Sequence, residues 1–198
     1  RSSDLGAQIK PHFLQNALMS IKVLCRTRPK EAEQAVYDFA VFLRGNMNAL
    51  ESAEMILFRE ECKTIERYLH IEKMRFGERL QVQWDLQEEK FQIPPLTIQP
   101  LVENAVCHGI CQKMEGGTVQ IRSFRKNGEI CVQILDDGAG FDTEKLKDAD
   151  GIAIRNLKLR LKEFLNADLE IESRKGEGCR QTIHIPWEET EDENYSDR

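Results

Sequence analysis

The sequence lacks a long apolar run, a basic surplus and a disulfide-type cysteine spacing. No 18 consecutive residues are apolar, so no segment is predicted to span a membrane. The formal net charge of -6 argues against a protein that binds nucleic acid through a basic surface. The six cysteines are scattered through apolar segments, as expected for reduced thiols in a cytosolic protein. The chain has no secretory signal pattern and does not begin with Met, so we expect a piece of a longer protein.

Two stretches of apolar residues with helical spacing lie on either side of Arg28-Pro29-Lys30. The first contains Leu14, Leu18, Ile21 and Cys25, and the second contains Ala32, Ala35, Phe39, Phe42 and Met47. Apolar residues three or four positions apart share one face of a helix, so these stretches predict a helical hairpin. Two helices alone would bury both stripes poorly, whereas a dimer could bury them in a four-helix bundle.

A third helix is expected after a hinge at residues 45–56, where Gly45, Asn46, Asn48 and Ser52 weaken the helical pattern. Its apolar stripe consists of Phe58, Cys62, Ile65 and Leu69. Gly77 is suited to helix termination, so the helix should end near it.

From Leu80 onward the apolar period changes from 3.6 to 2, as is typical of half-buried strands. The alternating residues are Leu80, Val82, Trp84 and Leu86; Val119 and Ile121; Ile130, Val132 and Ile134; Leu169 and Ile171; and Ile183 and Ile185. Asn127-Gly128 indicates a hairpin, because both residues tolerate positive φ. Further helices are expected over 96–109 and 154–165.

We therefore predict an α+β fold, in which a dimerising helical hairpin precedes an α/β sandwich. The sheet is expected to be mixed, mainly antiparallel, with about five strands and helices on one face. The predicted divisions are 1–50 for the hairpin, 51–78 for a linker helix and 79–187 for the sandwich. Residues 188–198 hold six acidic residues and few apolar ones, which predicts a disordered tail.

Four short motifs carry candidate chemistry, and each also has a plain structural explanation. In the segment 99–109, Asn104 and His108 share a helix face next to Glu103, which could ligate Mg²⁺ or simply form a polar face. Asp136 to Gly140 follows a strand. Its carboxylate could accept a hydrogen bond from an amino group of a ligand, or the segment could simply be a strand-to-loop turn. Gly151 to Asn156 opens a helix, whose free N–H groups could bind phosphate, or it is simply a helix start preceded by glycine. Gly176-Glu177-Gly178 suits a hairpin turn.

Together, the order and spacing of these motifs resemble the ATP-binding domain of the histidine-kinase, gyrase and Hsp90 ATPase superfamily. The segment 94–109 resembles the N box, and 136–140 and 151–156 resemble the two glycine boxes. Within the superfamily, Gln8-Ile-Lys-Pro-His-Phe-Leu-Gln-Asn16 resembles the phospho-acceptor segment of LytS-type sensor histidine kinases. The segment 68–80 resembles the linker helix of that family. The resemblance covers roughly residues 5–187.

The resemblance implies a protein-histidine kinase that uses ATP and Mg²⁺. His12 would be the phosphorylated residue, with Asn16 on the same helix face and Glu103 as the base, since Phe13 occupies the position where an acidic residue is common. The nucleotide-binding residues would be Asn104 (the Mg²⁺ ligand), His108, Asp136 (which binds the adenine amino group), Gly138, Gly140, Gly151 and Asn156. Residues 141–150 would form a lid. Catalysis would rest mainly on positioning and charge neutralisation.

Three positions depart from the family pattern. Ala153 replaces the second glycine of the second glycine box, Cys107 replaces a common lysine, and Cys179 replaces a common threonine. Because all three are small, we expect binding to survive with reduced affinity or rate. Cys107, His108 and Cys111 could supply part of a zinc site, but no fourth ligand is apparent nearby, so incidental cysteines in the N-box helix are favoured.

The implied partners are a second copy of the chain and the receiver domain of a response regulator, and not nucleic acid. Segments N-terminal to this chain would carry the membrane attachment, which places the full-length protein on the cytoplasmic side of the bacterial membrane and leaves this fragment soluble. Three alternatives remain at this point. They are a nucleotide-binding dimeric scaffold without phosphotransfer, an anti-sigma-type serine kinase or related ATPase, and a plain helix–sheet interaction domain.

Overall fold

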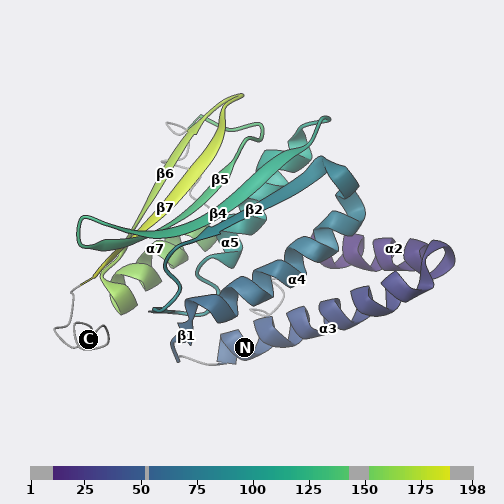
Figure 1. The fold of residues 1–198 in the computed structure, drawn as a ribbon, viewed down its shortest axis with the longest axis horizontal. Helices are drawn as coiled ribbons and strands as arrows, with labels where there is room; N and C mark the ends of the chain where they lie inside the picture. Colours follow the sequence, from purple (N-terminus) through teal and green to yellow (C-terminus); the bar gives the residue numbers. More distant parts are fainter. Residues whose placement is uncertain (1–10, 52–53, 143–151, 188–198) are drawn as a thin grey trace, which may run out of the picture.

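A computed structural model describes residues 11–51, 54–142 and 152–187. Its first part consists of three helices, α2 (Pro11–Thr27), α3 (Pro29–Glu51) and α4 (Phe58–Phe76). Only Arg28 separates α2 from α3, and Pro29 opens the second helix, where its missing N–H costs no hydrogen bond. The predicted helical hairpin is therefore confirmed. Helix α4 lies between this hairpin and the sheet (Figure 1).

A five-stranded sheet forms the second part of the molecule. Its strands are β2 (Leu80–Leu86), β4 (Gly117–Lys126), β5 (Glu129–Asp136), β6 (Asp168–Arg174) and β7 (Gly178–Pro186). Their order is β2-β4-β5-β7-β6, with β2 and β4 parallel and every other pair antiparallel. Asn127 and Gly128 form the predicted β4–β5 turn, with φ of 55° and 76°. The mixed, mainly antiparallel sheet is as predicted.

The described helices all lie on one face of the sheet (Figure 1). That face is covered by α5 (Gln99–Asn104) with the turns η2 (Ala105–Gly109) and η3 (Ile110–Gln112), by α7 (Ile152–Leu165), and by α4. Two features were not predicted: the short sheet of β1 (Ile56–Leu57) with β3 (Gln92–Ile93), and the turn η1 (Gly77–Arg79). The core runs without interruption from Phe13 and Phe42 through α4 to the inward side chains of the sheet.

The buried stripe of α2 differs from the expected one. Phe13, Ala17, Ile21 and Leu24 are buried, whereas Leu18 is 56% exposed and Cys25 is also exposed. In α3, Ala32, Ala35 and Phe42 are buried as expected, but Met47 is 49% exposed. The reason is that α2 packs against α4 as well as α3, which rotates its inner face toward Phe13. The α4 stripe of Phe58, Cys62, Ile65 and Leu69 is confirmed.

Two further boundaries were predicted wrongly. The hinge expected from residue 45 is absent up to Glu51, because α3 continues and buries Asn46, whose side chain donates to the Phe42 carbonyl over 2.9 Å. The helix expected from residue 96 begins at Gln99, because Leu96 has a φ of 58°, outside the helical range. The acidic tail lies outside the described residues, and the domain divisions remain predictions.

Candidate functional site

A cleft of about 590 Å³ opens between the α5–η2 segment, the end of β5 and the start of α7. Its size is within the range of small-molecule sites. The residues that line it are Asn104, Ala105, His108, Gly109, Gln112, Asp136, Ala139, Gly140, Phe141, Ile154, Ile171, Cys179 and Gln181. Four residues predicted from sequence motifs, Asn104, His108, Asp136 and Gly140, therefore meet in one cavity.

The N-terminal end of α5 is held by a buried carboxylate. Glu61 on α4 accepts hydrogen bonds from the backbone N–H groups of Ile98 (2.6 Å) and Gln99 (3.0 Å), which have no partner within the helix. Burial raises the pKa of Glu61 to about 7, against the opposing effect of these backbone donors. The sequence offered no signal for this role, because Glu61 looks like any other acidic residue in the first turn of α4.

A buried chain of amides then links α3 to Glu103. The Gln99 side-chain nitrogen donates to the Asn46 oxygen over 2.8 Å and to Glu103 Oε1 over 2.9 Å. All three residues are buried. Glu103 is thus fixed in position but does not line the cleft, so the structure separates it from Asn104 and His108.

The C-terminal part of the segment leaves the α-helical path. Residues Ala105–Gly109 form a single π-helical turn, a feature frequent at functional sites. Asn104 precedes this turn and His108 lies within it, and both still face the cleft. Cys107 and Cys111 are half-buried. Among the residues that the structure describes, Cys107, His108 and Cys111 do not gather as a metal-binding group.

Asp136 ends β5 at the edge of the cleft. Burial raises the pKa of its carboxyl to about 6, and Asp137 raises it further, while the amides of Gly138 and Cys179 oppose the shift. The Gly138 N–H donates to Asp136 Oδ1 over 2.9 Å. A Cβ at Gly138 would collide with the Gly109 backbone, so glycine is required for the close approach of this loop to η2. Gly138 itself does not line the cleft.

The loop after Asp136 is anchored to the β6–β7 turn. The Gly176 N–H donates to the Ala139 carbonyl over 2.7 Å, and Gly140 has a φ of 57°. Cys179 lies at the start of β7 and lines the cleft, and burial together with Asp136 raises the pKa of its thiol to about 12. The thiol is therefore a neutral, poorly nucleophilic group at neutral pH.

The predicted phospho-acceptor lies on α2, outside the cleft. His12 is exposed, and the Asn16 side-chain nitrogen lies 3.1 Å from its Nδ1 and 2.9 Å from its Nε2. The next residue, Phe13, is buried in a cluster with Phe42 and Tyr68 at ring-centre distances of 5.3 and 5.1 Å. This explains the absence of an acidic residue at position 13, where a carboxylate would be buried among aromatic rings.

Two more predicted site residues are not placed in the cleft. Gly151 and most of the expected lid lie outside the described residues, and Asn156 is exposed on α7 and does not line the cavity. The sequence also missed cleft residues. Phe141 and Ile154 belong to the expected lid and second glycine box but were not singled out, and Ile171 and Gln181 carry no motif. The two isoleucines look like ordinary core residues of their elements.

Two family models match the chain. The one described as "Histidine kinase" matches residues 1–80, and the one described as "Histidine kinase-, DNA gyrase B-, and HSP90-like ATPase" matches residues 95–189. YwpD of Bacillus subtilis is 36% identical over 194 residues, which cover 94% of this chain and 70% of that protein.

Relatives named as sensors are similar over a shorter share of their length. Sensor histidine kinase BtsS of Escherichia coli is 34% identical over 92% of this chain and 33% of its own. Sensor protein LytS of Bacillus anthracis is 31% identical over 96% of this chain and 34% of its own. The chain thus spans about a third of each of these two proteins.

The fold has solved counterparts at low identity. The histidine kinase domain from the Erythrobacter litoralis EL346 blue-light activated histidine kinase superposes with a TM-score of 0.52 at 18% identity, covering 93% of this chain and 92% of that one. The mycobacterial sensor histidine kinase MprB superposes with a TM-score of 0.51 at 16% identity, covering 68% of this chain and 97% of that one. These two similarities establish the fold alone.

Proposed function

Because the chain belongs to the LytS-type sensor histidine kinases, we propose that it binds Mg-ATP, phosphorylates His12 and passes the phosphoryl group to an aspartate of a response regulator. The observation that carries this proposal is the cleft that brings together Asn104, His108, Asp136 and Gly140. It also argues against a plain interaction domain, which would have no need of such a cavity.

The residues of the cleft fit the chemistry of an adenine nucleotide. A carboxylate at Asp136 accepts a hydrogen bond from the amino group of adenine and repels the carbonyl that guanine has at that position. The side-chain oxygen of Asn104 is the type of hard ligand that Mg²⁺ takes beside phosphates and waters. The apolar side chains of Ile154 and Ile171 line the same cavity and can contact a flat base. Gly151 and Asn156 are proposed for the phosphates on the family pattern.

When bound, ATP supplies the γ-phosphoryl group, and Mg²⁺ neutralises charge on its phosphates. A ring nitrogen of neutral His12 is the nucleophile, and Asn16 orients the ring through the contacts described above. Glu103 is proposed as the group that takes up the proton released from the imidazole. Because neither His12 nor Glu103 lines the cleft, transfer requires the cleft and α2 to approach one another.

The hairpin leaves an apolar surface that a second copy could cover. Its exposed apolar residues are Leu18, Met19, Val23, Val36, Tyr37 and Met47. We propose a homodimer with a four-helix bundle of α2 and α3 from each copy. None of the described helices could cross a membrane. We propose that the full-length protein lies on the cytoplasmic side of the bacterial membrane and is attached to it through segments outside this chain.

The test is label transfer from γ-labelled ATP with Mg²⁺, comparing wild type, His12→Gln and Asn104→Asp. We expect an acid-labile, base-stable label on wild type and on neither variant. His70→Gln is the matched control, because His70 is also a partly exposed histidine and pairs with Asp38 rather than lying at the acceptor motif. Loss of label in this control would contradict the assignment of His12.

One observation favours a second candidate, a nucleotide-binding dimeric scaffold. The cleft carries Cys179, and its neighbour segment carries Cys107, where the family commonly has polar or basic groups. Absence of label with intact ATP binding by calorimetry would favour the scaffold. Repeating the assay with the native N-terminal region attached would distinguish a true scaffold from a fragment that needs its sensor.

A further inference from the structure

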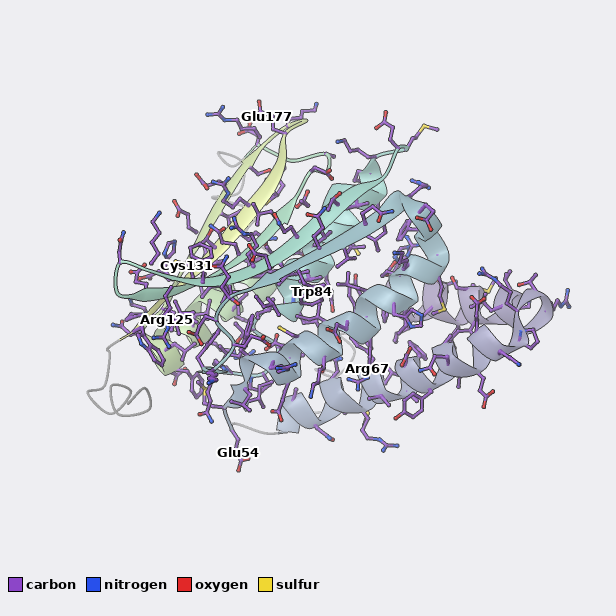
Figure 2. The ribbon with its side chains drawn as sticks, in the orientation of Figure 1. Glu54, Arg67, Trp84, Arg125, Cys131 and Glu177 are labelled. Carbon is purple, nitrogen blue, oxygen red and sulfur yellow. The ribbon has the colours of Figure 1, made fainter. Side chains whose placement is uncertain are left out.

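A group of metal-ligand side chains lies on the open face of the sheet, away from the cleft. Cys131 on β5 is directly opposite His184 on β7 in the antiparallel register. Glu129 precedes Cys131 by two residues and therefore points to the same face. Cys131 is labelled on the sheet in Figure 2, and no described helix covers this face (Figure 1).

The ligand atoms of these three residues converge. His184 Nδ1 lies 3.0 Å from Glu129 Oε2 and 3.9 Å from Cys131 Sγ, and all three atoms lie within 4.8 Å of one another. Tetrahedral zinc holds thiolate, imidazole and carboxylate ligands about 3.4–3.6 Å apart, as its bond lengths of about 2.0–2.3 Å require. The two distances from His184 Nδ1, 3.0 and 3.9 Å, lie on either side of that spacing.

A fourth residue supports the ring from its other side. His184 Nε2 lies 3.5 Å from Glu170 Oε2 on β6. Histidines that bind a metal commonly direct their second ring N–H to a carboxylate, which fixes the tautomer and the ring orientation. In the tautomer that carries its ring proton on Nε2, the lone pair of Nδ1 is directed toward Glu129 and Cys131.

The charges around these three residues suit a divalent cation. The carboxylates of Glu129 and Glu170 lie 3.0 and 3.5 Å from the two ring nitrogens of His184, so two carboxylates flank one imidazole. Cys131 is only 4% exposed. A bound cation deprotonates a coordinating thiol, so Cys131 can act as a thiolate ligand.

We propose that Glu129, Cys131 and His184 form a zinc-binding site on the open face of the sheet, in which Glu170 orients His184. Binding forms Zn–S, Zn–N and Zn–O bonds and releases the Cys131 thiol proton to solvent. The remaining coordination position is open to water. The three ligands come from two neighbouring strands, so the ion would join β5 to β7.

The site is separate from the nucleotide cleft. Cys131 and Asp136 are five residues apart on β5, which corresponds to about 16 Å along a strand. Zinc should therefore raise the thermal stability of the protein without competing with ATP. Because this inference does not depend on phosphotransfer, its failure and the failure of the kinase proposal are distinguishable.

The experiment uses Co²⁺ as a coloured substitute for zinc. We expect the purified chain to give the intense visible absorption and the near-ultraviolet sulfur-to-cobalt band of a tetrahedral thiolate site, with Zn²⁺ displacing both. Cys131→Ser should lose both bands, and His184→Gln should weaken binding strongly. Glu170→Gln should weaken binding about tenfold, as loss of a supporting carboxylate typically does.

Cys25→Ser is the matched control, since Cys25 is an exposed cysteine on α2, and it should keep both bands. Circular dichroism and ATP binding check that each variant is folded. The proposal is overturned if the bands survive Cys131→Ser, if they vanish in Cys107→Ser or Cys111→Ser instead, or if wild type gives no thiolate band at all. A thermal shift with Zn²⁺ should be seen for wild type and lost in Cys131→Ser.

Discussion

The two ends of the α5–η2 segment are built in opposite ways. At its N-terminal end, the backbone N–H groups of Ile98 and Gln99 are paired with the buried Glu61 carboxylate. At its C-terminal end, a π-turn places Asn104 and His108 against an open cleft. A fixed end and an open end on one short segment let the fold hold ligand-facing groups in place without filling the space that the ligand needs.

We expect changes at the fixed N-terminal end of the segment to alter stability, and changes at its open C-terminal end to alter ligand binding. Glu61→Ala should have the largest effect. It leaves two buried N–H groups unpaired at about 1–3 kcal/mol each, so we expect a loss of about 3 kcal/mol in the free energy of unfolding. Denaturant titration measures it. Glu66→Ala, an exposed position on the same helix, should change stability by less than about 0.5 kcal/mol.

The charge of Glu61 gives this prediction a pH signature. Its pKa rises from 4.5 to about 7 on folding, so the folded state favours the protonated form. Its stabilising contribution is therefore fully present below pH 4.5 and is lost as pH rises through 7, by up to about 3 kcal/mol. In Glu61→Gln, which keeps an acceptor but cannot ionise, this part of the pH dependence should disappear. An unchanged pH profile in the variant would show that Glu61 is ionised without penalty.

At the open end, Asp136→Asn should weaken ATP binding about tenfold to hundredfold, the range for loss of a charged hydrogen-bond acceptor. Stability should change little by comparison. Isothermal calorimetry with ATP and GTP measures the effect and the loss of base selectivity. Asp137→Asn is the matched control, because Asp137 accepts from the Thr118 N–H and does not line the cleft. Equal losses in both variants would contradict the proposed contact with adenine.

The pH dependence of ATP binding is the next smaller effect. The Asp136 carboxyl has a pKa of about 6 in the free protein, and only its ionised form is a full acceptor. Affinity should therefore fall as pH drops through 6, to about one tenth at pH 5. ATP itself titrates nearby, so the comparison is with Asp136→Asn at each pH. If the ATP affinities of wild type and variant fall in parallel as pH drops, the titration of the Asp136 carboxyl does not control ATP binding.

The smallest predicted effect concerns the link from the hairpin to Glu103. Asn46→Ala removes the acceptor of the Gln99 side chain and should cost about 1 kcal/mol of stability, with ATP affinity nearly unchanged. Asn48→Ala, an exposed neighbour on α3, should have no measurable effect. A large change in ATP affinity for Asn46→Ala would mean that the two ends of the segment are coupled.

Most elements could be predicted, but several contacts could not. The β2 alternation of Leu80, Val82, Trp84 and Leu86 matches its bounds, because a period of two needs only local sequence. The continuation of α3 through Gly45 could not be predicted, since Asn46 is stabilised by Gln99, 53 positions away. The inner face of α2 was misjudged for a similar reason, because Phe13 is buried by α4 as well as by α3.

The sequence by itself determined the family, the order of the longer helices and of the five strands of the large sheet, and the motif residues that meet in the cleft, because these depend on residue types at fixed local spacings. The tertiary structure decided how those motifs are held. Only the fold brings Glu61 beneath α5, packs Gly138 against Gly109, and sets Cys131 opposite His184. Each of these contacts joins residues more than 25 positions apart, so strand register and helix packing, and not local pattern, place them together.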